Sequence, residues 1–158
     1  MLGRIFPKQY DNTYDGWRLA TALLALIVAL RLAQGISIMA DPVATAMGAD
    51  RIPVASYAPQ AAAAVVLLFT LLGFSLVLTA LIGVVAMIRY RAMIPLVYIL
   101  LLVQALGSRA IVALHPIVRG GSAMMVGPLS FGTAINLATY AVMIAGFILS
   151  VLRRRDAA

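Results

Sequence analysis

Four long runs of apolar residues constrain this chain more than any other feature. They predict membrane spans at about residues 17–40, 60–88, 92–115 and 128–152. An α-helix rises about 1.5 Å per residue, so about 20 residues cross a hydrocarbon core roughly 30 Å thick. Lipid offers the backbone no hydrogen bonds, and the short alternating segments of membrane strands do not occur here, which leaves helices. The sequence therefore predicts an all-α integral membrane protein, a single four-helix transmembrane domain over residues 1–158.

The composition agrees with a membrane protein. Hydrophobic residues make up 64% of the chain and charged residues 11%, against roughly 45–50% and 25% in an ordinary soluble domain. These values exclude a soluble globular protein and a disordered one. The first run contains Arg31 and is longer than the apolar stretch of a signal peptide, so we expect a retained helix.

The basic residues predict the orientation of the chain in the membrane. With four spans, only Arg51 and Arg119 fall in the loops on one side. The positive-inside rule then places both termini in the cytoplasm. The formal net charge of +7 is thus a topology signal, and nucleic acid is not an expected partner. The eight basic residues on the cytoplasmic side are Arg4, Lys8, Arg18, Arg89, Arg91, Arg153, Arg154 and Arg155.

The short segment Arg89–Arg91 predicts a tight turn between the second and third spans, so those helices are expected to be antiparallel neighbours. The predicted arrangement is an up-down bundle. Eleven of the twelve basic residues are Arg and alanine is abundant, a bias typical of GC-rich bacterial genomes. We therefore expect a multi-pass protein of the bacterial cytoplasmic (inner) membrane.

Small and hydroxyl-bearing residues recur every four positions in the second span. Side chains of this size let helix backbones approach closely in a membrane. The pattern predicts either packing within the bundle or an oligomer interface, and it consists of Ser75, Thr79 and Gly83.

Polar side chains inside the spans mark a candidate ligand-binding pocket. Charged residues are costly in the hydrocarbon core and are functional candidates by default. Arg31 lies nine residues before Ala40, about 13 Å from the end of its span. The alternative for Arg31 and Arg109 is that they extend to the membrane surface. The candidate pocket comprises Arg31, Gln34, Gln104, Ser108, Arg109, Asn136 and Tyr140.

The residue inventory argues against an enzyme. The chain has no Cys, no Glu and a single His, and its five Asp residues all lie outside the apolar runs. Thiol chemistry, a haem held by two histidines and a zinc site with three protein ligands are therefore not expected. We predict no metal site, no cofactor and no catalytic residue.

Two functions remain open. The first is a non-catalytic accessory or scaffold subunit that packs against a larger membrane complex or against itself, since the chain has little mass outside its four spans. The second is a small carrier or a lipid- or anion-binding protein, in which the Arg-lined pocket faces an anionic group. The expected partners are membrane lipids and another membrane protein or a second copy of the chain.

Overall fold

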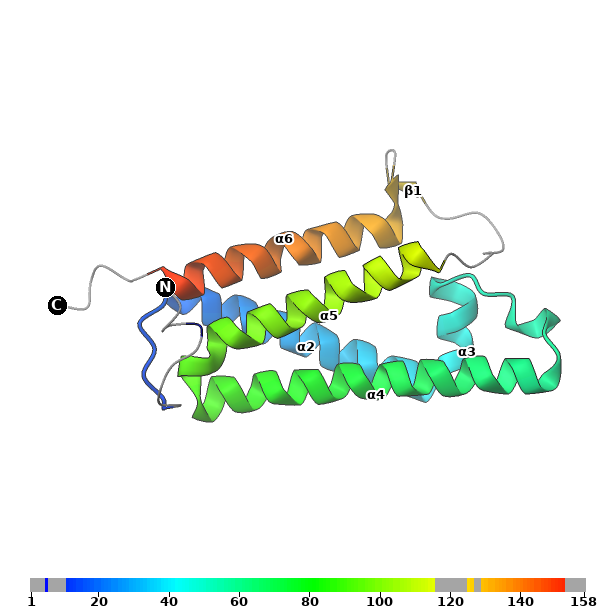
Figure 1. Ribbon diagram of the computed structural model, residues 1–158, viewed down its shortest axis with the longest axis horizontal. Coiled ribbons are helices and arrows are strands. Elements are labelled where there is room, and N and C mark those ends of the chain that lie inside the picture. Colours follow the sequence, from blue (N-terminus) through cyan, green and yellow to red (C-terminus); the bar gives the residue numbers. More distant parts are fainter. Residues whose placement is uncertain (1–4, 6–10, 116–124, 127–128, 153–158) are drawn as a thin grey trace.

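Four long helices dominate the computed structural model, which describes residues 11–115, 125–126 and 129–152 together with Ile5 (Figure 1). Each helix contains a segment long and apolar enough to cross a membrane. The prediction of an all-α fold with four potential membrane spans is confirmed, which fits a multi-pass membrane protein. The helices are α2 (Arg18–Ala40), α4 (Pro59–Arg89), α5 (Ile94–Leu114) and α6 (Phe131–Val151).

Short elements connect the long helices. After α2 the chain forms helical turns, the first of which is α3 (Pro42–Ala44). The Asp41 carboxylate caps α3 by accepting a hydrogen bond from the Ala44 backbone N–H at 2.8 Å. Prolines at the starts of α4 and α5 suit positions where the helix needs no N–H donor. The remaining short elements are a π-helix (Thr45–Ala49), 3₁₀ turns at Val54–Ser56 and Arg91–Met93, and an antiparallel pair of two-residue strands, β1 (Met125–Val126) and β2 (Leu129–Ser130).

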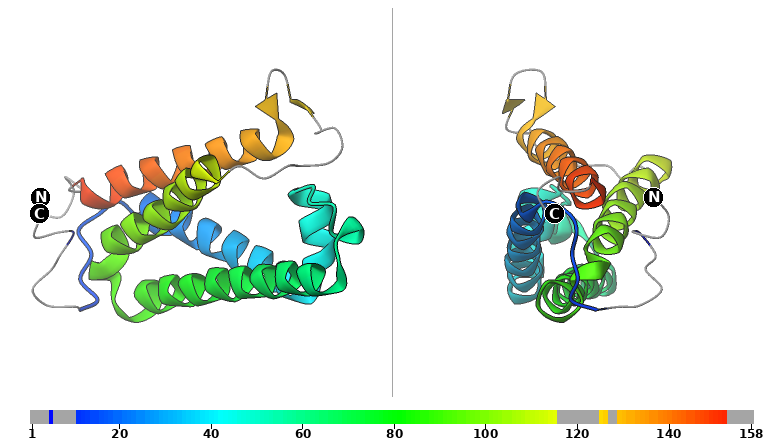
Figure 2. Two further views of the ribbon diagram at one scale, coloured as in Figure 1. Left: turned by 45° about the vertical axis from the view of Figure 1, so that its right-hand side comes forward. Right: turned by 90° about the vertical axis from the view of Figure 1, so that its left-hand side faces the viewer.

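The long helices run alternately in opposite directions, and α2 packs against both α4 and α6 while α5 packs against α6 (Figures 1 and 2). We call the end that carries the turn Arg91–Met93 the hairpin end and the opposite end, which carries residues 41–58, the loop end. Helices α4 and α5 lie close together at the hairpin end and diverge toward the loop end (Figure 2). The pair α2 and α4 is therefore held together along most of its length, whereas α4 and α5 are not.

The apolar core lies toward the hairpin end. Its largest member is Tyr98, which is completely buried and donates a hydrogen bond from its hydroxyl to the Ala20 carbonyl at 2.7 Å, so the buried polar group is satisfied. The segment before α2 closes this end through two backbone hydrogen bonds, from the Trp17 N–H to the Leu149 carbonyl and from the Ala92 N–H to the Asp11 carbonyl, each at 3.3 Å. The other large buried side chains are Leu24, Ile94, Leu101, Met143 and Val97.

Helices α2 and α4 approach each other through glycines. A Cβ atom on Gly35 would lie 2.7 Å from the Gly73 carbonyl oxygen, and one on Gly73 would lie 2.8 Å from the Gly35 carbonyl oxygen. Nearer the hairpin end, a Cβ on Gly83 would lie 2.5 Å from Cγ2 of Val28. In lipid, helices associate through close packing of this kind because apolar surface alone provides little driving force. The contact between α2 and α4 is thus fixed by residues that leave no room for a side chain.

Adding one methyl group at Gly35 tests this contact. We expect Gly35→Ala to destabilise the protein by about 1–3 kcal/mol, because overpacking forces the two backbones apart. Gly107→Ala is the matched control, since a Cβ at that position meets no atom within 4 Å and alanine is the better helix former. The measurement is thermal unfolding in detergent. Equal melting temperatures for Gly35→Ala and the wild type would contradict the close α2–α4 contact.

Candidate intramembrane polar site

Arg31 lies on the face of α2 that packs against the other helices. It follows Ile27 by four residues and precedes Ile38 by seven, and both isoleucines are buried. Residues at these spacings share one side of a helix. Arg31 itself is half-buried, so its long side chain runs from the helix interface rather than from the outer surface. It donates no hydrogen bond to any residue that the structure describes.

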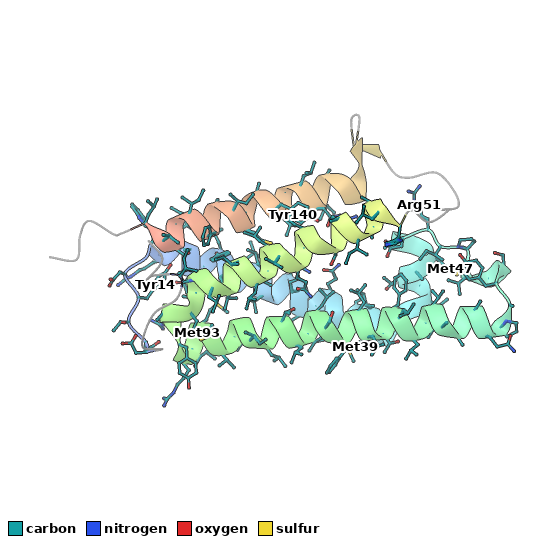
Figure 3. All side chains as sticks on the ribbon, in the orientation of Figure 1. Tyr14, Met39, Met47, Arg51, Met93 and Tyr140 are labelled. Carbon is teal, nitrogen blue, oxygen red and sulfur yellow. The ribbon has the colours of Figure 1, made fainter. Side chains whose placement is uncertain are left out.

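Tyr140 bonds one of the two intramembrane arginines and lies on a helix that packs against the helix of the other. The Arg109 Nε atom donates a hydrogen bond to the Tyr140 hydroxyl at 3.2 Å, and the Arg31 guanidinium is within range of an electrostatic interaction with the same tyrosine. These residues come from three helices, α5, α6 and α2, and Figure 3 shows Tyr140 near the middle of α6. One arginine is bonded to the phenol, and the second is contributed by a helix that packs against α6. We call Arg31, Arg109 and Tyr140 the cationic cluster.

No acidic residue in the spanning helices balances this charge. The sequences of α2, α4, α5 and α6 contain no Asp or Glu. Arginine keeps its proton under all ordinary conditions, so the cluster cannot remove its charge by deprotonation. A cation away from water is costly unless an opposite charge or hydrogen-bond acceptors compensate it.

Two amides lie on the helices that form the cluster. Gln104, one and a half turns before Arg109 on α5, is half-buried, and its Oε1 atom is enclosed without a donor in the described part of the chain. Asn136 lies one turn before Tyr140 on α6, is half-buried and takes part in an interaction of its own. Polar side chains from two helices therefore occur at this level of the fold.

The other predicted site residues lie apart from the cluster. Gln34 is exposed. Ser108 is exposed and donates a hydrogen bond to the Gln104 carbonyl of its own helix at 2.7 Å. The Ser75 and Thr79 hydroxyls likewise donate to carbonyls within α4, which satisfies them in an apolar environment without any partner helix.

Sequence reasoning missed two kinds of structural residue. Gly35 and Gly73 hold α2 and α4 together, although only Ser75, Thr79 and Gly83 were predicted to pack. The signal was present, since both glycines lie inside apolar runs, where small residues mark helix contacts. Tyr98 was also missed, and its position within an apolar run gave a weaker signal for a buried hydroxyl that bonds another helix.

The donors of the cluster define its chemistry. Two guanidinium groups and a phenol hydroxyl offer several N–H and O–H donors, and neither guanidinium provides an acceptor. Such a set suits an anionic oxygen-rich group. Among the described residues, no group of three or more His, Cys, Asp or Glu side chains gathers in a way that would hold a metal ion.

No family model matches this sequence, and no curated protein or solved structure matches it either. What the chain does is therefore inferred from its own side chains and their placement.

Replacement of Arg31 by an apolar residue tests its interior position. We expect Arg31→Leu to raise the stability of the isolated protein by about 1–4 kcal/mol, because the variant no longer has to hold a charge in the helix interface. Arg31→Lys keeps the charge and should show no such gain. The measurement is thermal unfolding of all three proteins in one detergent. A lipid-facing arginine that extends to the membrane surface would instead leave all three melting temperatures equal.

Proposed function

We propose that this chain is a non-catalytic accessory or scaffold subunit, which packs a membrane-embedded helix face against a larger membrane protein. In this proposal the four helices form an up-down bundle in a bacterial cytoplasmic membrane, with both termini in the cytoplasm. The placement of described basic residues supports the orientation, because Arg18, Arg89 and Arg91 all lie at the hairpin end. The remaining cytoplasmic residues of the prediction, at positions 4, 8 and 153–155, lie outside the described residues, as does Arg119.

The scaffold proposal rests on one observation, which is a face of α5 that no other described helix covers. Four residues recur there at spacings of four, three and four, which is the pattern of a helix–helix seam. A Cβ on Gly107 meets no atom within 4 Å, whereas Leu100 and Ile111 are exposed by 47% and 62%. We call this set the α5 stripe, and it consists of Leu100, Gln104, Gly107 and Ile111.

At the glycines described in the other spanning helices, a neighbouring helix fills the space that a Cβ atom would take. Gly35 and Gly73 touch each other's backbones, Gly83 lies against Val28, and a Cβ on Gly146 would overlap the Tyr98 ring. Each of these glycines therefore accommodates a neighbouring helix. Gly107 stands out among the spanning-helix glycines whose surroundings the structure describes, because it offers the same close approach to a helix that the described part of this chain does not supply.

A partner helix fits this face physically. Helix α4 covers α5 near the hairpin end and then diverges from it (Figure 2), so no other described helix covers the loop-end half of α5 on that side. Small residues and carboxamides are enriched at helix contacts in membranes, where they allow close packing and hydrogen bonding between helices. The α5 stripe contains one of each, flanked by large apolar side chains.

The orientation is tested with reporter fusions. We expect reporters fused after Arg91 and after Arg155 to show a cytoplasmic location, and one fused after Asp50 to show a periplasmic location, as the positive-inside rule requires. A periplasmic signal after Arg91 would overturn the four-span arrangement.

The docking face is tested by filling it. We expect Gly107→Leu to abolish association with the partner, since the added side chain occupies the space a helix needs, while the melting temperature of the isolated protein stays within a few degrees of wild type. Ala113→Leu is the matched control, because it adds similar volume to an exposed position about 120° around α5 from Gly107. The readout is photo-crosslinking from position 111 in intact membranes.

Three results are informative. A stoichiometric partner that is crosslinked in the wild type and in Ala113→Leu but not in Gly107→Leu supports the proposal. Crosslinks between copies of this chain would assign the face to self-association instead of an accessory role. Equal crosslinking in Gly107→Leu and the wild type would show that the α5 stripe faces lipid.

A further inference from the structure

The cationic cluster lies on a different side of α5 from the stripe that docks a partner. Arg109 follows Gln104 by five residues, which is a rotation of about 140° around the helix. Its hydrogen bond to Tyr140 fixes that side against α6. The cluster therefore needs an explanation of its own, separate from the proposed docking function.

We propose that Arg31, Arg109 and Tyr140 form a binding site for a phosphate group, carried by an anionic lipid headgroup or free in solution. The two arginines supply positive charge from two different helices, and no acid in the spanning helices neutralises them. A phosphate group supplies the missing negative charge and enough oxygens to be shared by both guanidinium groups.

The donors left over in the cluster match a tetrahedral oxyanion. Arg109 uses its Nε–H for Tyr140, and within the described chain its terminal N–H groups have no other acceptor. The Tyr140 hydroxyl accepts that bond, so its own hydrogen remains available for donation. Arg31 donates no hydrogen bond to another described residue, so among these residues its planar fork is available to ligand oxygens. Guanidinium groups are weakly hydrated and match phosphate oxygens in pairs, which makes arginine better suited than lysine to such a site.

The surroundings of the cluster favour a lipid as the carrier of the phosphate. Leu106 precedes Arg109 by three residues, and Leu137 and Ile144 lie three residues before and four after Tyr140, so each shares a helix face with the polar residue. All three side chains are exposed, by 50%, 51% and 47% respectively. An acyl chain can lie against these residues while the headgroup reaches the cluster.

The cluster lies below the loop-end termini of α2 and α5, so the headgroup of a bound lipid has to reach down to it. Arg109 lies five residues before the end of α5 at Leu114, about 7 Å along the helix. Arg31 lies nine residues before the end of α2 at Ala40, about 13 Å along the helix. The phosphate is thus drawn about one and a half to two and a half helical turns below the loop-end termini of α5 and α2. A site of this kind holds a lipid out of its ordinary position in the leaflet.

Native mass spectrometry of the whole chain tests the site. The protein is released from nanodiscs of phosphatidylglycerol mixed with phosphatidylcholine, and retained lipid is quantified. We expect one phosphatidylglycerol to be retained, with roughly a tenfold or larger loss in Arg31→Gln and in Arg109→Gln, since each removes charge-assisted hydrogen bonds. Tyr140→Phe should retain severalfold less phosphatidylglycerol than the wild type. Arg89→Gln removes a charge at the hairpin end, outside the cluster, and should retain lipid like the wild type.

A second arm distinguishes the source of the phosphate and separates binding from folding. Inorganic phosphate is titrated against the delipidated protein while its melting temperature is followed, with Arg31→Leu as a variant that should melt no lower than the wild type. The site is assigned to free phosphate if phosphate raises the melting temperature only when Arg31 and Arg109 are both present, and if the protein retains no excess of phosphatidylglycerol over phosphatidylcholine.

Two outcomes overturn the proposal. One is that neither phosphatidylglycerol nor phosphate binds in a way that depends on the two arginines. The other is that the arginine variants bind both like the wild type but lose the protein crosslinked at position 111, which would assign the two cations to an acidic side chain of a partner. Loss of crosslinking in Gly107→Leu with full lipid retention would leave this site intact, so the two proposals fail independently.

Discussion

Where α2 and α4 cross, no side chain separates their backbones, because Gly35 and Gly73 face each other and a Cβ on either would lie under 3 Å from the carbonyl oxygen of the other. This contact fixes the rotation of α2. The same rotation that turns Gly35 toward α4 turns Leu24, Ile27 and Ile38 into the interior, and it carries Arg31 with them. The charge is therefore held inside the helix assembly by the packing of the residues around it.

The fold divides into two halves as a result. Near the hairpin end, apolar side chains from all four long helices surround Tyr98, whose hydroxyl is satisfied by the Ala20 carbonyl. Toward the loop end, α2 and α5 carry Arg31 and Arg109 beside further apolar residues, and α4 and α5 diverge. In lipid, a region that carries cations and a glycine with open space around it is suited to binding rather than to packing within the chain. We accordingly place both proposed interactions, with a helix and with a phosphate group, in the loop-end half.

The sequence predicts the four helices well because length and apolar character alone decide whether a segment spans a membrane. The start of the last helix is less well predicted: the apolar run begins near residue 128, whereas α6 begins at Phe131 after the short strand pair. The sequence also does not predict which residue forms a hydrogen bond with Tyr140. It groups Arg31, Arg109 and Tyr140 in one candidate pocket without predicting which residues bond. The hydrogen bond to Tyr140 comes from Arg109, because the relative depth and rotation of α5 and α6 decide it. The Gly35–Gly73 contact depends in the same way on the register between two helices.

The divergence of α4 from α5 is the feature on which the account depends most, and distances between spin labels measure it directly. The chain has no cysteine, so labels attach only at introduced pairs. Val85→Cys with Leu96→Cys samples the hairpin end, and Leu67→Cys with Val112→Cys samples the loop end, each pair at matching depth if the two helices were parallel. Double electron–electron resonance in nanodiscs should give a clearly longer distance for the loop-end pair. Equal distances for the two pairs would contradict the account, because α4 would then cover the face of α5 that is proposed to dock a partner helix.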